Sequence, residues 1–538
     1  MVDLIGKVKI AMAGGSIWLL TVVCSTSYIT PEILTATAES ASAEATSLPT
    51  AFFIFPTNTP IPSPTATVTP DPAFPSATPS ATSTSNATMI PSETVLDASA
   101  PPYIYTAQAG DSLARLSKRF AVNPIEIVSP QSIPEQGLIN PGQILMIPWR
   151  IGITTPSEAI LPDSEVVFSS SVSNFDVVTY VETLDGYLSR YSEYLGHGGW
   201  MSGAEIVERV AVENSINPRI LLALLEYQGH WVLGRPHNIS ETDYPMGYVE
   251  TNKDGLFQQL IWAVNQLSSG YYGWRRAEML ELTWPNRTTT RLAPQLNAGS
   301  VAIQNFFAQL YQGEEWERAV DPQGDFISLY NAMFGGDPWV RADEVEPLFP
   351  PGLSQPDMIL PFLRNQRWSF TGGPHGAWEG EGSLAALDFA PGSLETGCAD
   401  SESWILAAAA GIVVRKGDGT LVLDLDGDGN EQTGWVLLYL HISNTDNAPV
   451  GTWVSQGTLL GNPSCEGGRA TGTHMHIARK YNGEWIEADG AIPFNLGGWL
   501  AHYDGTPYTG TLTRDGVVIK ACQCASFETV IFRSKDDP

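Results

Sequence analysis

Hydrophobic residues between positions 165 and 345 recur every three or four residues, which is the spacing of one face of an α-helix. Ser202 followed by Glu205 has the pattern of a capping box, so a helix is expected to begin there. Three more segments have helical periodicity: 219–231, 255–267 and 297–310. The sequence therefore predicts a mainly α middle domain over residues 165–345.

An alternating pattern of apolar and polar residues precedes this helical region. Residues 103–107 alternate as a strand does, and residues 139–148 contain a second strand pattern. Helices are expected to begin near Leu113, after a turn that can cap a helix, and near Pro124. We therefore predict a small βααβ unit over residues 101–150.

Strand patterns also follow the helical region. Apolar runs at 386–390 and 437–442 predict a mainly antiparallel β domain over residues 365–495. Shorter strand-like runs predict a β-rich extension over residues 496–538. The sequence assigns that extension no role.

The first hundred residues lack the pattern of a packed core. Lys7 and Lys9 precede an apolar run ending at Cys24, which predicts a signal peptide or N-terminal anchor over residues 1–24. Cys24 stands where bacterial lipoproteins are acylated, but Val precedes it instead of the usual small residue, so lipid attachment and plain secretion remain alternatives. Residues 25–100 are rich in Ser, Thr and Pro and predict a disordered linker.

The chain is acidic, with 28 Lys and Arg against 58 Asp and Glu and a net charge of −30 over 538 residues. Nucleic-acid binding depends on basic groups that neutralise phosphates, so this charge argues against nucleic acid as a partner. The length is sufficient for several domains. We expect a monomer outside the cytoplasm, with membrane contact only through an N-terminal anchor or lipid.

Histidines gather in one part of the predicted β domain. His474 and His476 are two residues apart on a predicted strand, so their rings point to the same side. The strand at 437–442 can bring His441 alongside them. The remaining candidates are His375 and Asp388. Each histidine alone is typical of a hydrogen-bonded ring at a strand end, but the group favours zinc, which takes nitrogen and oxygen ligands tetrahedrally.

These passages resemble the lysostaphin/LytM-type zinc endopeptidases of bacterial cell walls. The likeness extends from about residue 372 to 485 and lies in the order of four motifs: the strand Ala386-Leu387-Asp388-Phe389-Ala390, Tyr439-Leu440-His441, a G-x-x-V-x-x-G-x-x-[IL]-G segment at 451–461, and T-G-x-H-x-H at 471–476. The resemblance implies that one Zn²⁺ ion is held by His375, Asp388 and His476. It also implies that His441 and His474 are catalytic residues that do not bind the metal.

The spacing of the first motif departs from the family. Three residues usually separate the first His from the Asp, and that spacing would select Glu379 instead of Asp388. Asp388 is preferred because it lies in an apolar strand pattern, whereas Glu379 lies in a Gly- and Glu-rich loop. A longer loop between two anchored ligands costs little free energy.

Residues 101–150 resemble a LysM domain, since they contain its G-D-[ST]-L and [IL]-x-P-G-Q-x-L-x-[IV]-P segments. The resemblance implies binding to N-acetylglucosamine-containing glycan. The implied contacts come from two loops: Gly110, Asp111, Ser112 and Leu113 in one, and Ile139, Asn140, Pro141 and Gly142 in the other. The alternative is a domain of this fold that has lost its sugar site.

The helix predicted at 219–231 is similar to the helix of lysozyme-like lytic transglycosylases that ends in their catalytic acid. By this resemblance Glu226 would protonate a glycosidic oxygen. The match is partial because Tyr227 stands where the family has a Ser. A helical spacer with a solvated Glu226 is the competing interpretation.

Cysteines and an acidic turn complete the candidates. Cys398, Cys465, Cys522 and Cys524 allow three disulfide connectivities in an exported chain. We favour Cys398–Cys465, which would brace loops on two sides of the metal site. A bridge between Cys522 and Cys524, two residues apart, is expected to be strained. Residues 424–430 imitate the start of a calcium loop, but the closing Glu is missing, so an acidic hairpin turn is favoured.

The sequence therefore predicts a secreted or surface-attached peptidoglycan hydrolase. Its zinc domain would cut an amide bond in stem peptides or cross-bridges, and its LysM unit would hold it on glycan. Two alternatives remain: a non-catalytic peptidoglycan-binding scaffold or hydrolase activator, and a glycan-cleaving enzyme that acts through Glu226.

Overall fold

The small unit that begins at Tyr103 has one two-stranded sheet and one α-helix. Its elements are β1 (Tyr103–Thr106), α2 (Leu113–Phe120), the 3-10 turn η1 (Pro124–Glu126) and β2 (Ile144–Ile147). The two strands are antiparallel, and Leu116 and Phe120 from the helix pack on them. The second predicted helix is only a single 3-10 turn, because the backbone of Ile127 is already extended.

The helical region is a bundle with short hairpins. Its helices are α3 (Val177–Glu182), α4 (Gly203–Asn214), α5 (Pro218–Gly229), α6 (Ile239–Asp243), α7 (Leu256–Arg275), α8 (Ala298–Ala308), α9 (Glu314–Val320), α10 (Asp325–Phe334) and α11 (Pro338–Ala342). Its 3-10 turns are η2 (Asp163–Glu165), η3 (Ser170–Val172), η4 (Leu188–Arg190) and η5 (Gly196–Gly198). Its hairpins pair β3 (Ser192–Tyr194) with β4 (Trp200–Ser202) and β5 (Glu281–Thr283) with β6 (Thr289–Arg291).

The helix starts follow from local sequence. Ser202 and Glu205 form the predicted capping box at the start of α4. At α5 the Asn217 side chain accepts the backbone N–H of Arg219. α5 ends two residues earlier than predicted, because His230 adopts a left-handed conformation with φ of 55°.

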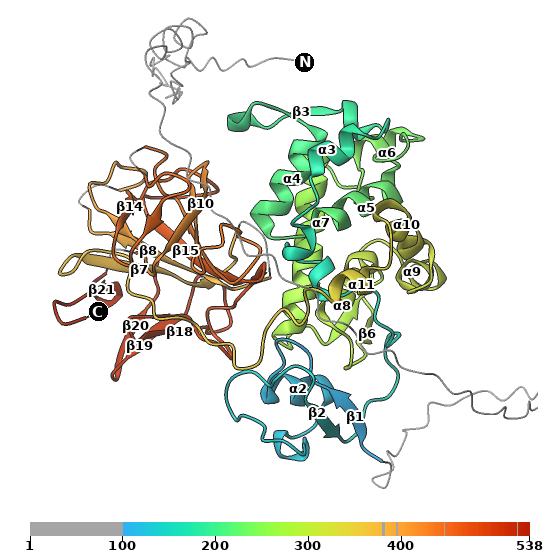
Figure 1. Ribbon diagram of the computed structural model, residues 1–538, viewed down its shortest axis with the longest axis horizontal. Coiled ribbons are helices and arrows are strands. Elements are labelled where there is room, and N and C mark those ends of the chain that lie inside the picture. The colour runs from blue at the N-terminus through green and yellow to red at the C-terminus, as the bar shows by residue number, and fades with distance from the viewer. Residues whose placement is uncertain (1–100, 379–381, 394–395, 446, 525, 538) are drawn as a thin grey trace, which may run out of the picture. The chain divides into compact units, whose positions relative to one another are not determined.

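The C-terminal region is built on a nine-stranded antiparallel sheet. Eight of its strands are neighbours in the order β13-β10-β11-β12-β15-β8-β7-β21, and the ninth, β16, pairs with β15. Its strands are β7 (Arg367–His375), β8 (Ala386–Pro391), β10 (Gly411–Gly417), β11 (Thr420–Asp424), β12 (Trp435–Leu440), β13 (Trp453–Val454), β15 (Met475–Tyr481), β16 (Glu484–Trp485) and β21 (Val530–Phe532). A short pair joins β9 (Ile405–Leu406) to β14 (Leu459–Gly461). The predicted mixture of helices and antiparallel sheet is confirmed (Figure 1).

The predicted extension forms a second sheet. It consists of β17 (Asn495–Leu496), β18 (Trp499–His502), β19 (Thr511–Arg514) and β20 (Val517–Lys520). The turn η6 (Phe527–Thr529) then leads into β21, which pairs with β7 of the main sheet. The end of the chain is thus attached to the strand that carries His375.

The main sheet is buried on both faces. Successive strand residues point to opposite sides, so Leu438 and Ala478 pack in one core and Leu437 and Ile477 in another. The first core is shared with the helical region, whose α4, α5, α7 and α8 line it. Burial on both faces explains why β12 is an almost continuous apolar run.

Arg275, at the end of α7, connects three parts of the described chain. Its guanidinium pairs with Asp163 and Glu484, both at 2.8 Å, and donates to the carbonyl of Ala109. Glu484 also accepts the hydroxyl of Tyr271 at 2.7 Å. All of these groups are buried, so loss of one partner would leave a charge without compensation.

Two disulfides are present within the described part of the chain. Cys398 is bonded to Cys465, with 5.6 Å between their Cα atoms. Cys522 is bonded to Cys524, although their separation of two residues made a direct bridge unexpected.

The computed structural model describes residues 101–378, 382–393, 396–445, 447–524 and 526–537. The predicted segments 1–24 and 25–100, Cys24 and Glu379 lie outside the described residues. Within the described ranges, no helix combines the length and apolar character needed to cross a bilayer. The domain boundaries proposed from the sequence stay predictions.

Candidate metal centre

Neighbouring strands of the main sheet bring the predicted site residues together. His476 on β15 is the direct register partner of Asp388 on β8. His375 ends β7, which pairs with the other edge of β8. His441 follows β12, whose last residue, Leu440, lies opposite His476. These residues therefore converge because of the order of the strands in the sheet. The sequence spacing of His474 and His476 alone does not predict that order.

Three side-chain atoms converge at the centre. His375 Nε2 lies 3.0 Å from His476 Nδ1, and each nitrogen lies 3.2 Å from Asp388 Oδ1. A tetrahedral zinc site with bonds of about 2.0–2.1 Å separates its ligand atoms by roughly 3.3–3.4 Å. All three residues are buried, with 2–6% of each exposed. The spacing therefore fits the ligand shell of a small cation.

Backbone carbonyls orient the imidazoles of His375 and His476. His375 Nδ1 lies 2.8 Å from the carbonyl oxygen of Gly373, and His476 Nε2 lies 3.0 Å from that of Ala377. A carbonyl only accepts, so the proton of each neutral ring lies on the outer nitrogen and the inner nitrogen presents a lone pair. Outer hydrogen bonds of this kind are typical of metal-binding histidines.

The Asp388 carboxylate has an unsatisfied oxygen. Its Oδ1 is buried and accepts no hydrogen bond of acceptable geometry from any described residue, although two ring nitrogens lie 3.2 Å away. Those nitrogens are the unprotonated ones, so they have no proton to donate. A buried acceptor facing two lone pairs is costly unless a cation lies between them. The donor set therefore fits a zinc ion.

Two further imidazoles line the same centre. His474 Nδ1 lies 2.7 Å from the carbonyl oxygen of Gly472, and His441 Nδ1 lies 3.0 Å from that of Glu466. Both rings therefore direct Nε2 inward, and their centroids are 4.4 Å apart. His474 Nε2 is 4.0 Å from Asp388 Oδ1, farther than the ligand nitrogens. These two side chains suit proton transfer near the metal more than coordination.

Burial and mutual proximity shift the acidities in this centre. Burial lowers the pKa of His441 to about 4, with further lowering from His474 and His476. Burial also lowers the pKa of His476, against the opposing effect of the neighbouring Asp388 carboxylate. At Asp388 burial raises the pKa, but His375 and His476 outweigh it, and the pKa lies well below its ordinary value. At neutral pH the centre thus holds the Asp388 carboxylate beside the neutral imidazoles of His441 and His476.

The Cys398–Cys465 disulfide supports the two non-ligand histidines. Thr473, which precedes His474, donates its backbone N–H to Gly397 at 3.0 Å. On the other side, Ser464 N–H donates to the carbonyl of His441 at 2.7 Å. Cys398 therefore follows a residue that is hydrogen-bonded to the loop of His474, and Cys465 follows a residue that is hydrogen-bonded to His441.

One contact of the centre was missed by sequence reasoning. The Tyr508 ring stacks on His375 with 4.1 Å between centroids and 21° between planes. Its carbonyl accepts the N–H of Gly373 at 2.9 Å. Tyr508 lies in the extension to which the sequence assigned no role, and an isolated aromatic residue in a turn gives no signal of this packing.

The two predicted glycan loops of the small unit are adjacent, since Ile139 N–H donates to the carbonyl of Asp111 at 2.8 Å. Asp111 itself is fully buried. Its carboxylate pairs with Arg119 at 2.8 Å and accepts the hydroxyl of Tyr105 at 2.7 Å. The Asp111 side chain therefore holds the unit together and is not available to a ligand.

The remaining loop positions differ in exposure. Gly110 and Ser112 are buried, and Gly110 packs against the side chain of Arg275. Ile139 is also buried, Leu113 and Pro141 are half-buried, and Asn140 and Gly142 are exposed. A glycan could reach the second loop more easily than the first.

Glu226 lies in the last turn of α5 with 8% of its surface exposed. Its Oε2 accepts the backbone N–H groups of Val232 and Leu233, each at 2.8 Å. The carboxylate thus holds the loop that follows α5 through Oε2. Glycan cleavage at Glu226 stays a prediction.

The acidic residues 424–430 lie in the hairpin turn between β11 and β12. The Asp424 carboxylate accepts the backbone N–H groups of Asp426 and Gly429 at 3.1 and 2.9 Å. Burial, together with the neighbouring Asp426, raises the pKa of Asp424 to about 6. The turn organises its own acidic groups, as expected of an acidic hairpin.

This chain is similar to several known protein families and enzymes. The family model for the LysM domain matches residues 105–148, and that for the LasA N-terminal domain matches residues 159–348. Protease LasA of Pseudomonas aeruginosa strain UCBPP-PA14 is 26% identical over 375 residues, which cover 65% of this chain and 81% of LasA. The beta-lytic metalloendopeptidase of Achromobacter lyticus is 28% identical over 172 residues, 31% of this chain and 42% of that protein. The solved M23 metalloprotease pseudoalterin covers 34% of this chain and 100% of its own, with 23% identity and a TM-score of 0.28.

The chain is a metalloendopeptidase, as the sequence predicted. Its resemblance to lysostaphin/LytM-type enzymes, combined with a LysM domain, is confirmed. The model of the LasA N-terminal domain covers the helical region, and the match to protease LasA is longer than that region.

Proposed function

We propose that this protein is a secreted, zinc-dependent peptidoglycan endopeptidase that hydrolyses an amide bond in stem peptides or cross-bridges. The observation that carries the proposal is the convergence of three buried ligand atoms within 3.0–3.2 Å. His375, Asp388 and His476 would hold one Zn²⁺ ion. A scaffold protein without activity would have no reason to keep this arrangement of buried polar atoms.

The zinc ion would supply Lewis acidity and lower the pKa of a bound water towards about 7. The protein's own groups then divide the remaining work. His441 and His474 both face the centre through Nε2, so either can take the proton of the attacking water and return it to the leaving amine. The other histidine, once it is protonated at Nε2, can donate a hydrogen bond to the oxyanion of the tetrahedral intermediate.

The LysM unit would place glycan near the metal centre. A cavity of about 460 Å³ is lined by Ser112 and Gly137 of this unit and by Pro374, which directly precedes His375. Peptidoglycan carries its peptides on glycan strands, so a strand held here would raise the local concentration of peptide at the centre. The exposed Asn140 and Gly142 are the proposed sugar contacts.

The test is a turbidity assay on purified sacculi, followed by chromatography of the released fragments. The wild-type protein is expected to clear sacculi and release new amino termini, and a chelator or His474→Ala should abolish clearing. His502→Ala removes a histidine outside the centre and should behave as wild type. Release of anhydro or reducing sugar ends that Glu226→Gln abolishes would support glycan cleavage instead. Absence of any cleavage would support a binding scaffold.

A further inference from the structure

A second group of metal-type side chains lies away from the peptidase centre, in the helical region. His230 ends α5, and His237 and Glu241 lie around the start of α6. Glu241 Oε2 is 3.2 Å from His230 Nδ1 and 3.4 Å from His237 Nδ1. One donor atom from each residue lies within 4.8 Å of the other two. These spacings are close to those between ligand atoms in a tetrahedral zinc site.

One oxygen of Glu241 lies close to three nitrogen atoms. Its Oε2 accepts the backbone N–H of His237 at 2.8 Å and lies within hydrogen-bond distance of His230 Nδ1, at 3.2 Å. His237 Nδ1 is also only 3.4 Å from this oxygen, but no hydrogen bond joins the two atoms. A carboxylate oxygen offers about two lone pairs, so a hydrogen bond does not account for the approach of the second ring. A cation between the rings and the carboxylate would account for it, because each Nδ1 would then contribute a lone pair to the metal.

Local backbone conformation and hydrogen bonds hold His230 and Glu241 in this arrangement. His230 occupies the left-handed position after α5 where Gly is the usual residue, with φ of 55°. Trp231, fully buried, donates its indole N–H to the carbonyl of Glu241 at 2.8 Å. Asn238 donates its side-chain N–H to Glu241 Oε1 at 2.8 Å, which fixes the carboxylate from the other side. The carboxylate is therefore positioned before any ligand binds.

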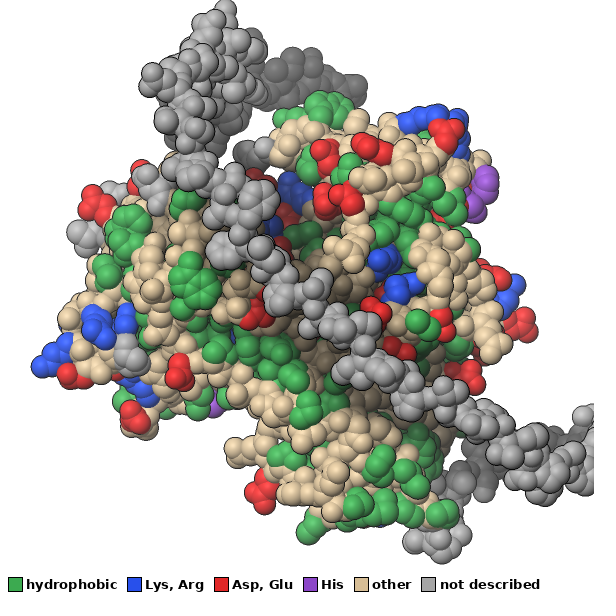
Figure 2. All heavy atoms as spheres, viewed as in Figure 1, with side chains coloured by type: hydrophobic (Ala, Val, Ile, Leu, Met, Phe, Trp, Pro, Cys, Tyr) green, Lys and Arg blue, Asp and Glu red, His purple; other side chains and the backbone are tan. Residues whose placement is uncertain are grey.

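The two rings remain accessible. The side chains of His230 and His237 are 41% and 66% exposed, whereas that of Glu241 is 19% exposed. Their ring centroids are only 4.1 Å apart. Histidine side chains are visible at the surface beside α6 (Figure 2). A metal could enter from solvent and keep at least one coordination position for water.

We propose that His230, His237 and Glu241 form a second metal site, for Zn²⁺ or a chemically similar transition-metal ion, that ties the loop after α5 to α6. Two imidazoles and one carboxylate suit zinc, whereas Ca²⁺ and Mg²⁺ require mainly oxygen ligands. This site is independent of the peptidase centre and of the activity proposed for it. It would make the α5–α6 connection, which also contains the N–H donors to Glu226, dependent on metal for its stability.

Zinc stoichiometry tests the proposal on the full-length protein. The protein is stripped with chelator, dialysed against buffered micromolar free zinc and analysed by plasma mass spectrometry. The wild type is expected to hold two zinc ions per chain. His237→Gln, at the most exposed ligand, should hold one, and His476→Ala should also hold one. His502→Gln is the matched control, because it removes another partly exposed histidine and should keep two.

The outcomes separate this site from the peptidase centre. A wild-type value of one that His237→Gln leaves unchanged overturns the second site. A wild-type value of one that His237→Gln abolishes supports the second site and rejects the peptidase ligands. Thermal unfolding gives a second readout: zinc should raise the Tm of the His476→Ala variant but not that of a His237→Gln/His476→Ala double variant. Equal shifts in both would overturn the proposal.

Discussion

His476 and Asp388 are direct register partners on adjacent antiparallel strands, with 3.2 Å between Nδ1 and Oδ1. Residues paired in this way present their side chains on the same face of the sheet. On the other side of β8, Gly372 is the register partner of Asp388. The position of the carboxylate is therefore set by strand pairing on both sides.

Gly372 leaves the space that the Asp388 carboxylate occupies. A Cβ at this position would overlap with Asp388 Oδ2. We predict that Gly372→Ala displaces the carboxylate and weakens zinc binding by roughly 10–100-fold, the range seen when groups that orient metal ligands are changed. Competition with a chromophoric chelator measures this affinity. Gly392→Ala is the control, since its Cβ would meet only the Arg367 carbonyl, at 3.4 Å. Equal affinities in the two variants would contradict this role.

We predict that His441 and His474 transfer protons during catalysis and do not contribute to metal binding. His441→Ala and His474→Ala should each lower kcat by about 10²–10⁴-fold, the usual contribution of general acid–base catalysis. The zinc content of both variants should equal that of the wild type. Loss of zinc in either variant would show that the residue is a ligand and that the assignment is wrong.

The Cys398–Cys465 bridge is predicted to position these two histidines. Replacing both cysteines with serine should lower kcat by roughly 10-fold or more, because small displacements of catalytic groups are costly. Zinc should be retained, since the three ligands lie on strands. The corresponding double variant at Cys522 and Cys524 is the control and should keep normal turnover. Equal losses in both double variants would point to general destabilisation.

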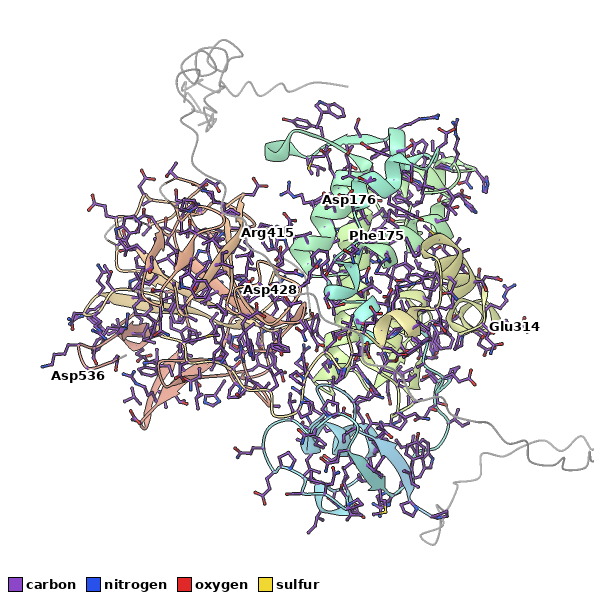
Figure 3. The ribbon with its side chains drawn as sticks, in the orientation of Figure 1. Phe175, Asp176, Glu314, Arg415, Asp428 and Asp536 are labelled. Atoms are coloured by element: carbon purple, nitrogen blue, oxygen red, sulfur yellow. A yellow bond between two sulfur atoms is a disulfide. The ribbon has the colours of Figure 1, made fainter. Side chains whose placement is uncertain are left out.

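Acid sensitivity should arise partly from Glu431. Burial raises the pKa of this carboxyl, but Lys480 and Arg415 outweigh burial and lower it from 4.5 to about 2. Arg415 extends from β10, and Asp428 lies in the acidic turn nearby (Figure 3). A folded-state pKa below the unfolded value gives stability that is present above pH 4.5 and is lost as the pH falls towards 2. The contribution is roughly 3 kcal/mol at neutral pH.

Urea unfolding at several pH values tests this prediction. Glu431→Gln should be less stable than the wild type at pH 7, and the difference should shrink between pH 4.5 and the lowest pH at which both remain folded. Glu281→Gln, on an exposed strand position, should follow the wild type throughout. A constant difference between Glu431→Gln and the wild type would contradict the proposed pKa.

Local sequence patterns predicted the parts of this site that lie within single strands. The spacing of His474 and His476 and the apolar run before His441 indicated rings on neighbouring strands. The apolar strand around Asp388 favoured it over Glu379, and the structure brings Asp388 to the two ligand histidines. Such inferences are possible within a strand because its periodicity determines which side chains share a face.

Contacts between distant parts of the chain could not be predicted in this way. Tyr508 reaches His375 only because the C-terminal extension returns to the main sheet. Gly110 packs against Arg275, which joins the LysM unit to the helical region. Periodicity shows that a surface is buried, but it does not identify the surface that covers it.

The most direct test of the metal centre is X-ray diffraction from crystals of the zinc-loaded protein, with data collected on both sides of the zinc absorption edge. We expect an anomalous peak within about 2.0–2.3 Å of His375 Nε2, Asp388 Oδ1 and His476 Nδ1. His441 and His474 should lie beyond bonding distance of it. A peak coordinated by Glu379 in place of Asp388, or no peak between these three side chains, would contradict the account.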